Sequence, residues 1–139
     1  KSISLLPNLL EKQKAVEMGY YEIWQTRENF VTEGSTSNAF IVNCDKVILT
    51  HPSNNFILGG VTRDCVIEIA LKNKIPIKEK AFTISDLNNC NEAFLSSTTA
   101  GVLPVIKVNE TVIKKGKIGE ITVKLMKLYK NFIEDQLNE

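Results

Sequence analysis

Four short polar segments carry the residue types that could do chemistry. They are Lys1-Ser2, Thr32-Glu33-Gly34-Ser35-Thr36-Ser37-Asn38, Leu58-Gly59-Gly60-Val61-Thr62-Arg63 and Ser96-Ser97-Thr98-Thr99. In the third segment a glycine pair precedes a predicted helix, so the backbone can approach an anion where the helix offers N–H groups and a positive dipole end. Hydroxyl and amide groups of the fourth segment could bind the same anion. From these residues alone, a plain tight turn at the glycines is the simpler interpretation, and phosphate binding is the alternative.

The elements that must position these segments are short. Apolar periodicity predicts helices over residues 8–18, 62–73 and 118–135. The Thr83-Ile84-Ser85-Asp86 spacing predicts a further short, capped helix. Strands are expected at 20–25, 30–32, 39–42, 47–50, 75–82, 93–96, 105–108 and 112–113. Because these strands and helices do not alternate strictly, an α+β fold is more consistent with the sequence than a doubly wound sheet.

The length and composition limit the classes of protein to which the chain can belong. The 139 residues suit one domain, residues 1–139, with 43% hydrophobic and 24% charged residues. A formal net charge of +1 gives no reason to expect a nucleic-acid or membrane partner, and the apolar runs are too short to span a bilayer. Three cysteines without a C-x-x-C pair argue against a disulfide framework or a metal site, and indicate free thiols in the cytoplasm. The chain begins with Lys1 instead of Met, which suggests a processed chain or a fragment.

The polar segments resemble the motifs of class IV (fold-type IV) pyridoxal-phosphate (PLP) aminotransferases. Residues 32–38 are similar to the family's T-E-G-S-x-S-N, 58–63 to L-x-G-I-T-R, 96–99 to its S-T-T segment and 116–119 to G-K-x-G. The opening residues 1–8 resemble K-S-x-x-L-L-x-N, the stretch that starts at the family's catalytic lysine. Five motifs in order over nearly the whole chain identify it as similar to the family's C-terminal domain, most closely that of the D-amino-acid branch.

The resemblance implies PLP as the cofactor and gives individual residues roles. Lys1 would hold PLP as a Schiff base and then move the proton between the substrate's Cα and the cofactor. Glu33 would face the pyridine nitrogen, and Leu58 would pack on the ring. The cofactor-binding set that follows from the resemblance is Lys1, Glu33, Ser35, Thr36, Ser37, Leu58, Gly60, Val61, Thr62, Ser97 and Thr98. The phosphate would meet the amides of Val61 and Thr62, with Thr98 completing its binding site.

The same resemblance implies a fold and partners. The fold would be the large C-terminal domain of a D-amino-acid aminotransferase-like enzyme, with a barrel-like sheet of short strands and flanking helices. An N-terminal domain that this chain lacks would close the site, and the complete enzyme would be a homodimer. The substrates would be an amino acid, of the D-alanine or D-glutamate type, and a 2-oxo acid. A branched-chain L-amino-acid aminotransferase, an aminodeoxychorismate lyase and a non-catalytic fragment stay open as alternatives.

The sequence also suggests roles for four further residues, Gly101, Arg63, His51 and Asn38. Gly101 departs from the family pattern, in which many relatives have an acidic residue after the S-T-T segment. Arg63 is not expected to bind the phosphate, because the family's arginine for that role lies in the N-terminal domain. His51 is interpreted as a loop residue, and Asn38 as a residue that stabilises its own loop.

Overall fold

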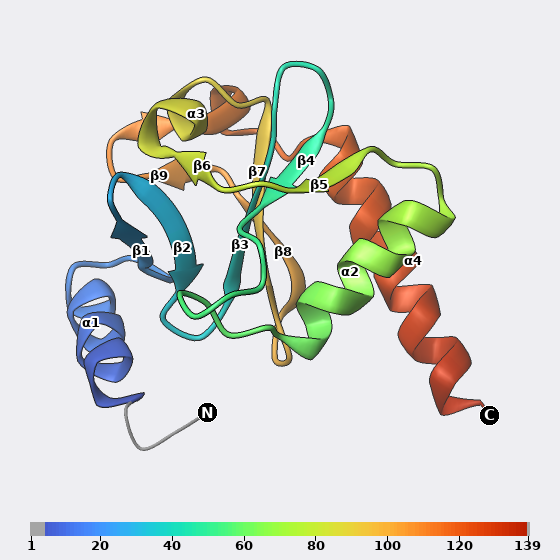
Figure 1. Cartoon of the computed structure of the whole chain (residues 1–139), viewed down its shortest axis with the longest axis horizontal. Helices are drawn as coiled ribbons and strands as arrows, with labels where there is room; N and C mark the ends of the chain where they lie inside the picture. Colours follow the sequence, from blue (N-terminus) through green and yellow to red (C-terminus); the bar gives the residue numbers. More distant parts are fainter. Residues whose placement is uncertain (1–4, 139) are drawn as a thin grey trace.

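Strand β3 (Asn38–Val42) lies at the centre of the fold, because it is buried along its whole length and pairs on both edges. The computed structural model describes residues 5–138 (Figure 1). Strand β7 (Glu92–Ser97) runs antiparallel along one edge over all five β3 residues. The other edge is shared by β4 (Ile48–Thr50), which pairs with Phe40–Val42, and by β2 (Phe30–Gly34), which pairs at Asn38.

The remaining strands extend this arrangement into one eight-stranded sheet. Strands β1 (Trp24–Arg27) and β6 (Phe82–Thr83) both pair antiparallel with β2. Strand β8 (Gly101–Val105) pairs antiparallel with β7, and β5 (Ile77–Glu79) pairs parallel with β4. A separate hairpin is formed by β9 (Lys107–Val108) and β10 (Thr111–Val112). The short strands and their mixed pairing confirm the predicted α+β class.

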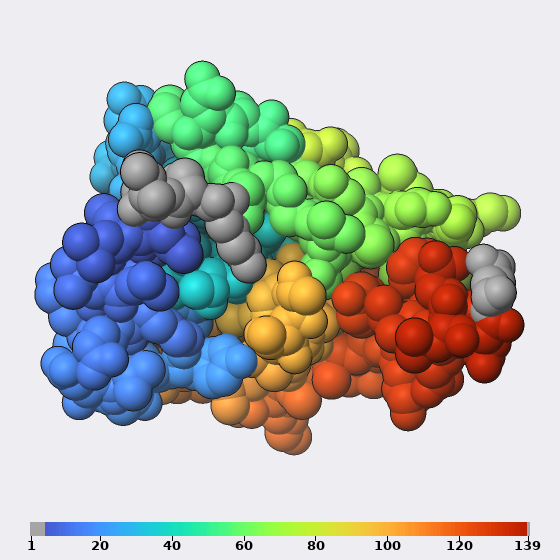
Figure 2. All heavy atoms as spheres, turned by 90° about the horizontal axis from the view of Figure 1, so that it is seen from below, coloured from blue at the N-terminus to red at the C-terminus, as the bar shows by residue number. Residues whose placement is uncertain are grey.

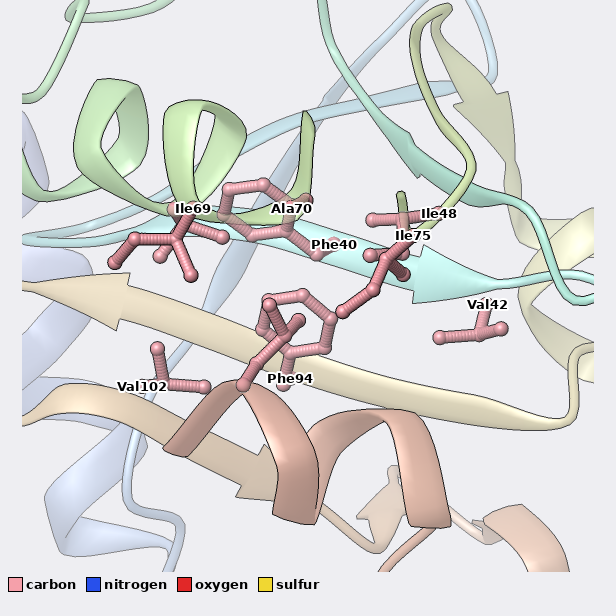
Figure 3. Close-up of a cluster of buried hydrophobic side chains, with 10 residues drawn as sticks. Phe40, Val42, Ile48, Ile69, Ala70, Ile75, Phe94 and Val102 are labelled. Carbon is pink, nitrogen blue, oxygen red and sulfur yellow. The ribbon is translucent and has the colours of Figure 1, made fainter. Parts of the chain in front are cut away.

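Side chains of β3 alternate between two hydrophobic clusters, as expected for a strand covered on both faces. Phe40 and Val42 point into the cluster formed with α2 (Val61–Lys72) and α4 (Glu120–Leu137), which lie side by side in Figure 1. Figure 3 shows this cluster, in which the rings of Phe40 and Phe94 stack with centroids 4.7 Å apart. Ala39 and Ile41 point into the second cluster, which includes Leu87 of α3 (Ile84–Asn88).

The helices agree with the sequence patterns that predict them. Helix α1 (Leu6–Glu17) carries Pro7 in its first turn and is followed by Gly19 at φ +80°, a left-handed conformation that suits glycine. Helix α3 has the predicted capping box, in which Thr83 and Asp86 bond to each other's backbone N–H groups. The strand expected at 112–113 is found at Val112, the last residue of β10, but Ile113 begins a 3-10 helix, η2 (Ile113–Gly116). No helix among residues 5–138 is both long enough and apolar enough to cross a membrane.

Two predicted strands agree with the structure only in part. The strand expected at 20–25 begins only at Trp24, because Tyr20–Ile23 turn so that the Glu22 side chain reaches the loop after β2. The range expected to be one strand at 105–108 is divided: Val105 ends β8, which begins at Gly101 and includes Pro104, and Lys107–Val108 form β9. Strand β8 pairs only with β7 and is therefore an edge strand, where a proline without an N–H is tolerated.

The G-K-x-G segment, residues 116–119, has a structural role at the start of α4. The buried carboxylate of Glu92 accepts hydrogen bonds from the backbone N–H of Ile121 at 3.2 Å and of Thr122 at 2.8 Å. An added Cβ at Gly119 would lie 1.7 Å from the Glu92 carboxyl carbon, so only glycine leaves room for it. A negative side chain at a helix N-terminus satisfies its N–H groups and complements its dipole.

We therefore expect Gly119→Ala to destabilise the fold by about 1–3 kcal/mol, because Glu92 must leave the helix N-terminus or the backbone must shift. Urea denaturation followed by circular dichroism measures this. The control is Glu134→Gln, which changes an exposed acid of the same helix far from its N-terminus and should shift the midpoint very little. Equal midpoints for Gly119→Ala and wild type would show that Glu92 does not depend on this glycine.

Candidate cofactor-binding site

One cavity of about 520 Å³ brings the polar segments together. Its volume suits a small organic ligand. In Figure 2 the segments that line it meet on one face, with α1 in blue, the loop before α2 in green and the turn after β7 in orange. Every predicted site residue that the structure describes lines this cavity: Glu33, Ser35, Thr36, Ser37, Leu58, Gly60, Val61, Thr62, Ser97 and Thr98. Lys1, the predicted catalytic residue, lies outside the described residues.

Glu33 forms an acidic wall of the cavity. Strand β2 holds it opposite Asn38 of β3, and its carboxylate Oε2 accepts a hydrogen bond from the Leu58 backbone N–H at 2.8 Å. Partial burial raises the pKa of Glu33 above its usual range; the Leu58 N–H and the nearby His51 oppose the shift without cancelling it. A half-buried carboxylate with a raised pKa is suited to sharing a proton with a basic nitrogen.

The N-terminus of α2 forms a second wall. Gly60 is the N-cap residue, with φ −74° and ψ 136°, and no side chain caps the helix. The first N–H groups of a helix have no partner within it, so those of Val61 and Thr62 are directed toward the cavity end of α2. The buried Thr62 and the exposed Leu58 lie on either side of this helix start. This arrangement can bind an anion such as a phosphate.

The turn after β7 forms a third wall. Ser96 is 1% exposed, and its hydroxyl has no hydrogen-bond partner among the described residues. Ser97 Oγ accepts a hydrogen bond from the Ala100 backbone N–H at 3.2 Å, which shapes the turn that presents Thr98. The turn ends at Gly101 with φ +61°, where a Cβ would lie 2.9 Å from the Tyr129 ring. The departure at Gly101 therefore fits the local packing, which leaves no room for an acidic side chain.

Asn38 lies between these walls, and the prediction for it was wrong. It does not simply stabilise its own loop, because its side-chain Nδ2 donates to the Leu58 carbonyl oxygen, 20 residues away, at 2.8 Å. In the sheet it pairs with Glu33 on one side and Ser96 on the other. Its Oδ1 occupies the space beside Gly60, where an added Cβ would lie 2.4 Å away. Asn38 thus connects all three walls.

Arg63 and His51 lie outside the residues that line the cavity. Arg63 is 1% exposed and donates to the His51 carbonyl oxygen at 2.8 Å and to Glu79 Oε2 at 2.6 Å. These bonds tie α2 to the loop after β4 and to β5. His51 follows β4 as a loop residue, but it is buried, with its ring 6.4 Å from that of Phe56.

Sequence reasoning missed several residues at the cavity. Leu5, Asn8, Asn55, Ile57 and Ser96 also line it, and Glu22 lies behind its Ser35–Ser37 wall. Asn55 follows His51-Pro52 in a polar loop, and nothing in its spacing distinguishes it from an ordinary turn residue. Ser96 could have been included, because it belongs to the same S-S-T-T run as Ser97 and Thr98.

The residues present fit PLP. The uncapped N–H groups at the start of α2 can donate hydrogen bonds to a phosphate. The Ser96 hydroxyl has no hydrogen-bond partner among the described residues, so a ligand would not have to displace one. A pyridine nitrogen matches Glu33, whose raised pKa favours a shared proton. The absence of a side chain at Gly60 leaves room for Asn38 beside the start of α2, and the exposed Leu58 supplies an apolar surface for a ring.

Solved structures with the same fold define the class of protein. A branched-chain aminotransferase from Thermoproteus uzoniensis superimposes with a TM-score of 0.84 and 35% identity, covering 91% of this chain and 41% of that one. The Escherichia coli branched-chain aminotransferase gives a TM-score of 0.83 and 30% identity over 88% of this chain and 41% of that one. The sequence model of the family Amino-transferase class IV matches residues 1–108. The chain therefore belongs to the class IV aminotransferase family.

Curated relatives place the chain within this family more narrowly. It is 46% identical over 134 residues to D-alanine aminotransferase from Staphylococcus aureus (strain N315), covering 96% of this chain and 47% of the relative. D-alanine aminotransferase from Listeria monocytogenes is 42% identical over 135 residues, covering 97% of this chain and 45% of the relative. The chain thus spans a little under half the length of the curated relatives it matches.

Proposed function

We propose that this chain is the cofactor-binding part of a PLP-dependent aminotransferase that exchanges an amino group between a D-amino acid, such as D-alanine, and a 2-oxo acid. The observation that carries this proposal is the single cavity that combines Glu33, the uncapped start of α2 and the turn at Ser97-Thr98. The identity to D-alanine aminotransferases over nearly the whole chain supports the same proposal.

The residues of the cavity have separate tasks in this proposal. PLP, when bound, stabilises negative charge at the substrate's Cα by accepting electrons into its protonated pyridine ring. Glu33 holds the proton at the ring nitrogen, and Leu58 covers one ring face. The N–H groups of Val61 and Thr62, with Thr98, bind the phosphate. Lys1 would hold the cofactor covalently through its ε-amine until the substrate's amine displaces it, and the released ε-amine would then move the proton at Cα.

A branched-chain L-amino-acid aminotransferase is the second candidate, because the solved structures with TM-scores of 0.83–0.84 carry that name. The identities favour the D-alanine type, at 46% against 35%. Glu33 and the phosphate-binding residues serve both reactions and cannot separate them. The two candidates are distinguished by assaying D-alanine and L-leucine as amino donors, with 2-oxoglutarate as the acceptor, in the protein that contains this chain together with the residues that complete the site.

We further propose that residues outside this chain complete the site, since the matched region is only 47% of the D-alanine aminotransferase from Staphylococcus aureus. Such a segment would cover the cavity, hold the substrate carboxylate and exclude water from the reacting atoms. The complete enzyme would be a homodimer. We expect the chain alone to show little or no turnover and a fragment equivalent to the other half of a relative to restore it in trans. Full turnover by the chain alone would contradict this proposal.

The covalent anchor is tested directly by borohydride reduction in the presence of PLP, followed by peptide mapping with mass spectrometry. We expect the phosphopyridoxyl group on the ε-amine of Lys1, with loss of the adduct when inorganic phosphate competes for the α2 end of the cavity. The α-amine of Lys1, if free, can also react with an aldehyde, so the fragment spectrum must identify the nitrogen. An adduct found on other lysines at random would refute the proposed anchor.

A further inference from the structure

Glu22 is a buried carboxylate outside every motif that the sequence singles out, and its side chain is only 7% exposed. It lies directly behind the Ser35–Ser37 wall of the cavity. Ser35 Oγ lies 2.5 Å from its Oε1, and Ser37 Oγ and Thr36 Oγ1 lie 3.0 Å and 3.3 Å from its Oε2. All three hydroxyls of this wall therefore share one acid.

The ionisation of Glu22 fixes the direction of these hydrogen bonds. Burial would raise the pKa of Glu22, but the hydroxyls of Ser35 and Ser37, the Ile23 N–H and the charge of Lys12, 3.7 Å away, together lower it below its usual range. An ionised carboxylate carries no hydrogen and can only accept. Each of the three hydroxyls must therefore donate its single hydrogen to Glu22, away from the cavity.

A hydroxyl that has donated its hydrogen keeps two lone pairs and can then only accept. The Ser35–Ser37 wall consequently offers hydrogen-bond acceptors in the cavity, in front of a buried negative charge. The start of α2 is opposite in character, because its N–H groups donate and its dipole end is positive. The cavity is thus polarised, with one wall suited to an anion and another suited to a protonated amine.

We propose that Glu22 is a positioning residue that turns the hydroxyls of Ser35, Thr36 and Ser37 into acceptors for a protonated amine bound in the cavity. The proposal rests on the proposed PLP function and goes beyond it, because it assigns an orienting role to a residue that does not line the cavity. Glu22 selects for the amine end of a phosphorylated ligand, while the phosphate end is recognised independently at α2.

The test compares two phosphorylated ligands that differ at one group. Pyridoxamine 5′-phosphate carries the amine, and 4′-deoxypyridoxine 5′-phosphate has a hydrogen in its place. Their dissociation constants for the full chain are measured by calorimetry or by fluorescence quenching of Trp24. We expect wild type to prefer the amine-bearing ligand. In Glu22→Gln this preference should fall by about tenfold, because the amide donates to at least one hydroxyl, which then turns its hydrogen toward the cavity.

A control and a second pair of variants separate charge and folding effects from orientation. Glu17→Gln removes an exposed acid of α1 whose side chain accepts a hydrogen bond from Gln13 and from no other residue of 5–138, and it should leave the preference unchanged. Ser35→Ala and Ser37→Ala retain the Glu22 charge but remove acceptors, and each should also reduce the preference. Their result decides the question if Glu22→Gln does not fold.

The outcomes distinguish this inference from the function on which it rests. If neither ligand binds wild type, the proposed function itself fails. If both ligands bind, but their ratio is the same in wild type, Glu22→Gln and the serine variants, the proposed role of Glu22 alone is overturned. A ratio that changes in Glu22→Gln and not in the serine variants would also overturn it, because charge and not hydroxyl orientation would then explain the preference.

Discussion

Glu33→Gln is expected to reduce the rate of transamination by about 10²-fold or more. The protein to be assayed is the one that contains this chain together with the residues proposed to complete the site. A glutamine cannot hold a proton at the pyridine nitrogen as a carboxylate does, and the loss of one positioned group that stabilises developing charge commonly costs about 10²–10³-fold in rate. PLP should still bind, because the α2 end and the Ser97-Thr98 turn are unchanged. Steady-state turnover and PLP titration measured on the same preparation separate the two effects.

The same substitution has an opposite expected effect on stability. Burial raises the folded-state pKa of Glu33 above its unfolded value, so its contribution to stability is full below the unfolded pKa and is lost as the pH rises through the folded pKa. Near neutral pH the ionised side chain is therefore a cost in the ligand-free chain. Glutamine removes this cost and can still accept the Leu58 N–H bond. We expect an equal or higher melting temperature for ligand-free Glu33→Gln at pH 7.

The control for both measurements is Glu110→Gln, an exposed acid that, within the described part of the chain, forms an ion pair with Lys107 alone and does not line the cavity. It should leave turnover and melting temperature unchanged. Full turnover by Glu33→Gln would show that no acid is needed at the ring nitrogen. A lower melting temperature would mean that the Leu58 bond requires a charged acceptor.

The sequence predicted segments that line one cavity, because the signals that mark these segments are local. Each signal depends on a few neighbouring residues. The signals are the glycines before a helix, the strand that ends in Thr-Glu-Gly, and the run of Ser and Thr residues after a strand. The sheet then brings these segments together, since Glu33, Asn38 and Ser96 are neighbours across β2, β3 and β7. The resemblance to the family indicated that the segments form one site, whereas the residues alone could not exclude a plain turn.

What the sequence did not predict depends on contacts between distant residues. From the sequence, Glu22 is predicted to be part of an ordinary strand. Its proposed role follows from its hydrogen bonds to residues 13 to 15 positions away. Asn38 reads as a loop residue, but its partner Leu58 is 20 positions away. The shift of β8 to Gly101–Val105 has the same cause, because pairing with β7 and not local propensity selects the strand.

Gly60→Ala is expected to weaken PLP binding at least tenfold, which corresponds to about 1.4 kcal/mol. The backbone at Gly60, with φ −74°, suits alanine, so the effect must come from the added Cβ. That atom would lie 2.4 Å from Asn38 Oδ1, well inside contact distance. Either α2 moves away from the phosphate, or Asn38 moves and releases the Leu58 carbonyl oxygen, which also loosens the Leu58 N–H bond to Glu33. PLP titration measures the loss.

A matched control and a double variant identify Asn38 as the cause. Gly59→Ala adds the same atom one residue earlier, where it meets only the hydroxyl of the exposed Ser53 at 2.9 Å, and it should bind PLP almost as wild type does. Asn38→Ala alone should also weaken binding, because the Leu58 carbonyl oxygen loses its donor. Residues in direct contact give non-additive effects. The double variant Asn38→Ala/Gly60→Ala should therefore bind PLP more tightly than the sum of the two losses predicts, whereas strict additivity would mean that Asn38 and Gly60 affect the cofactor independently.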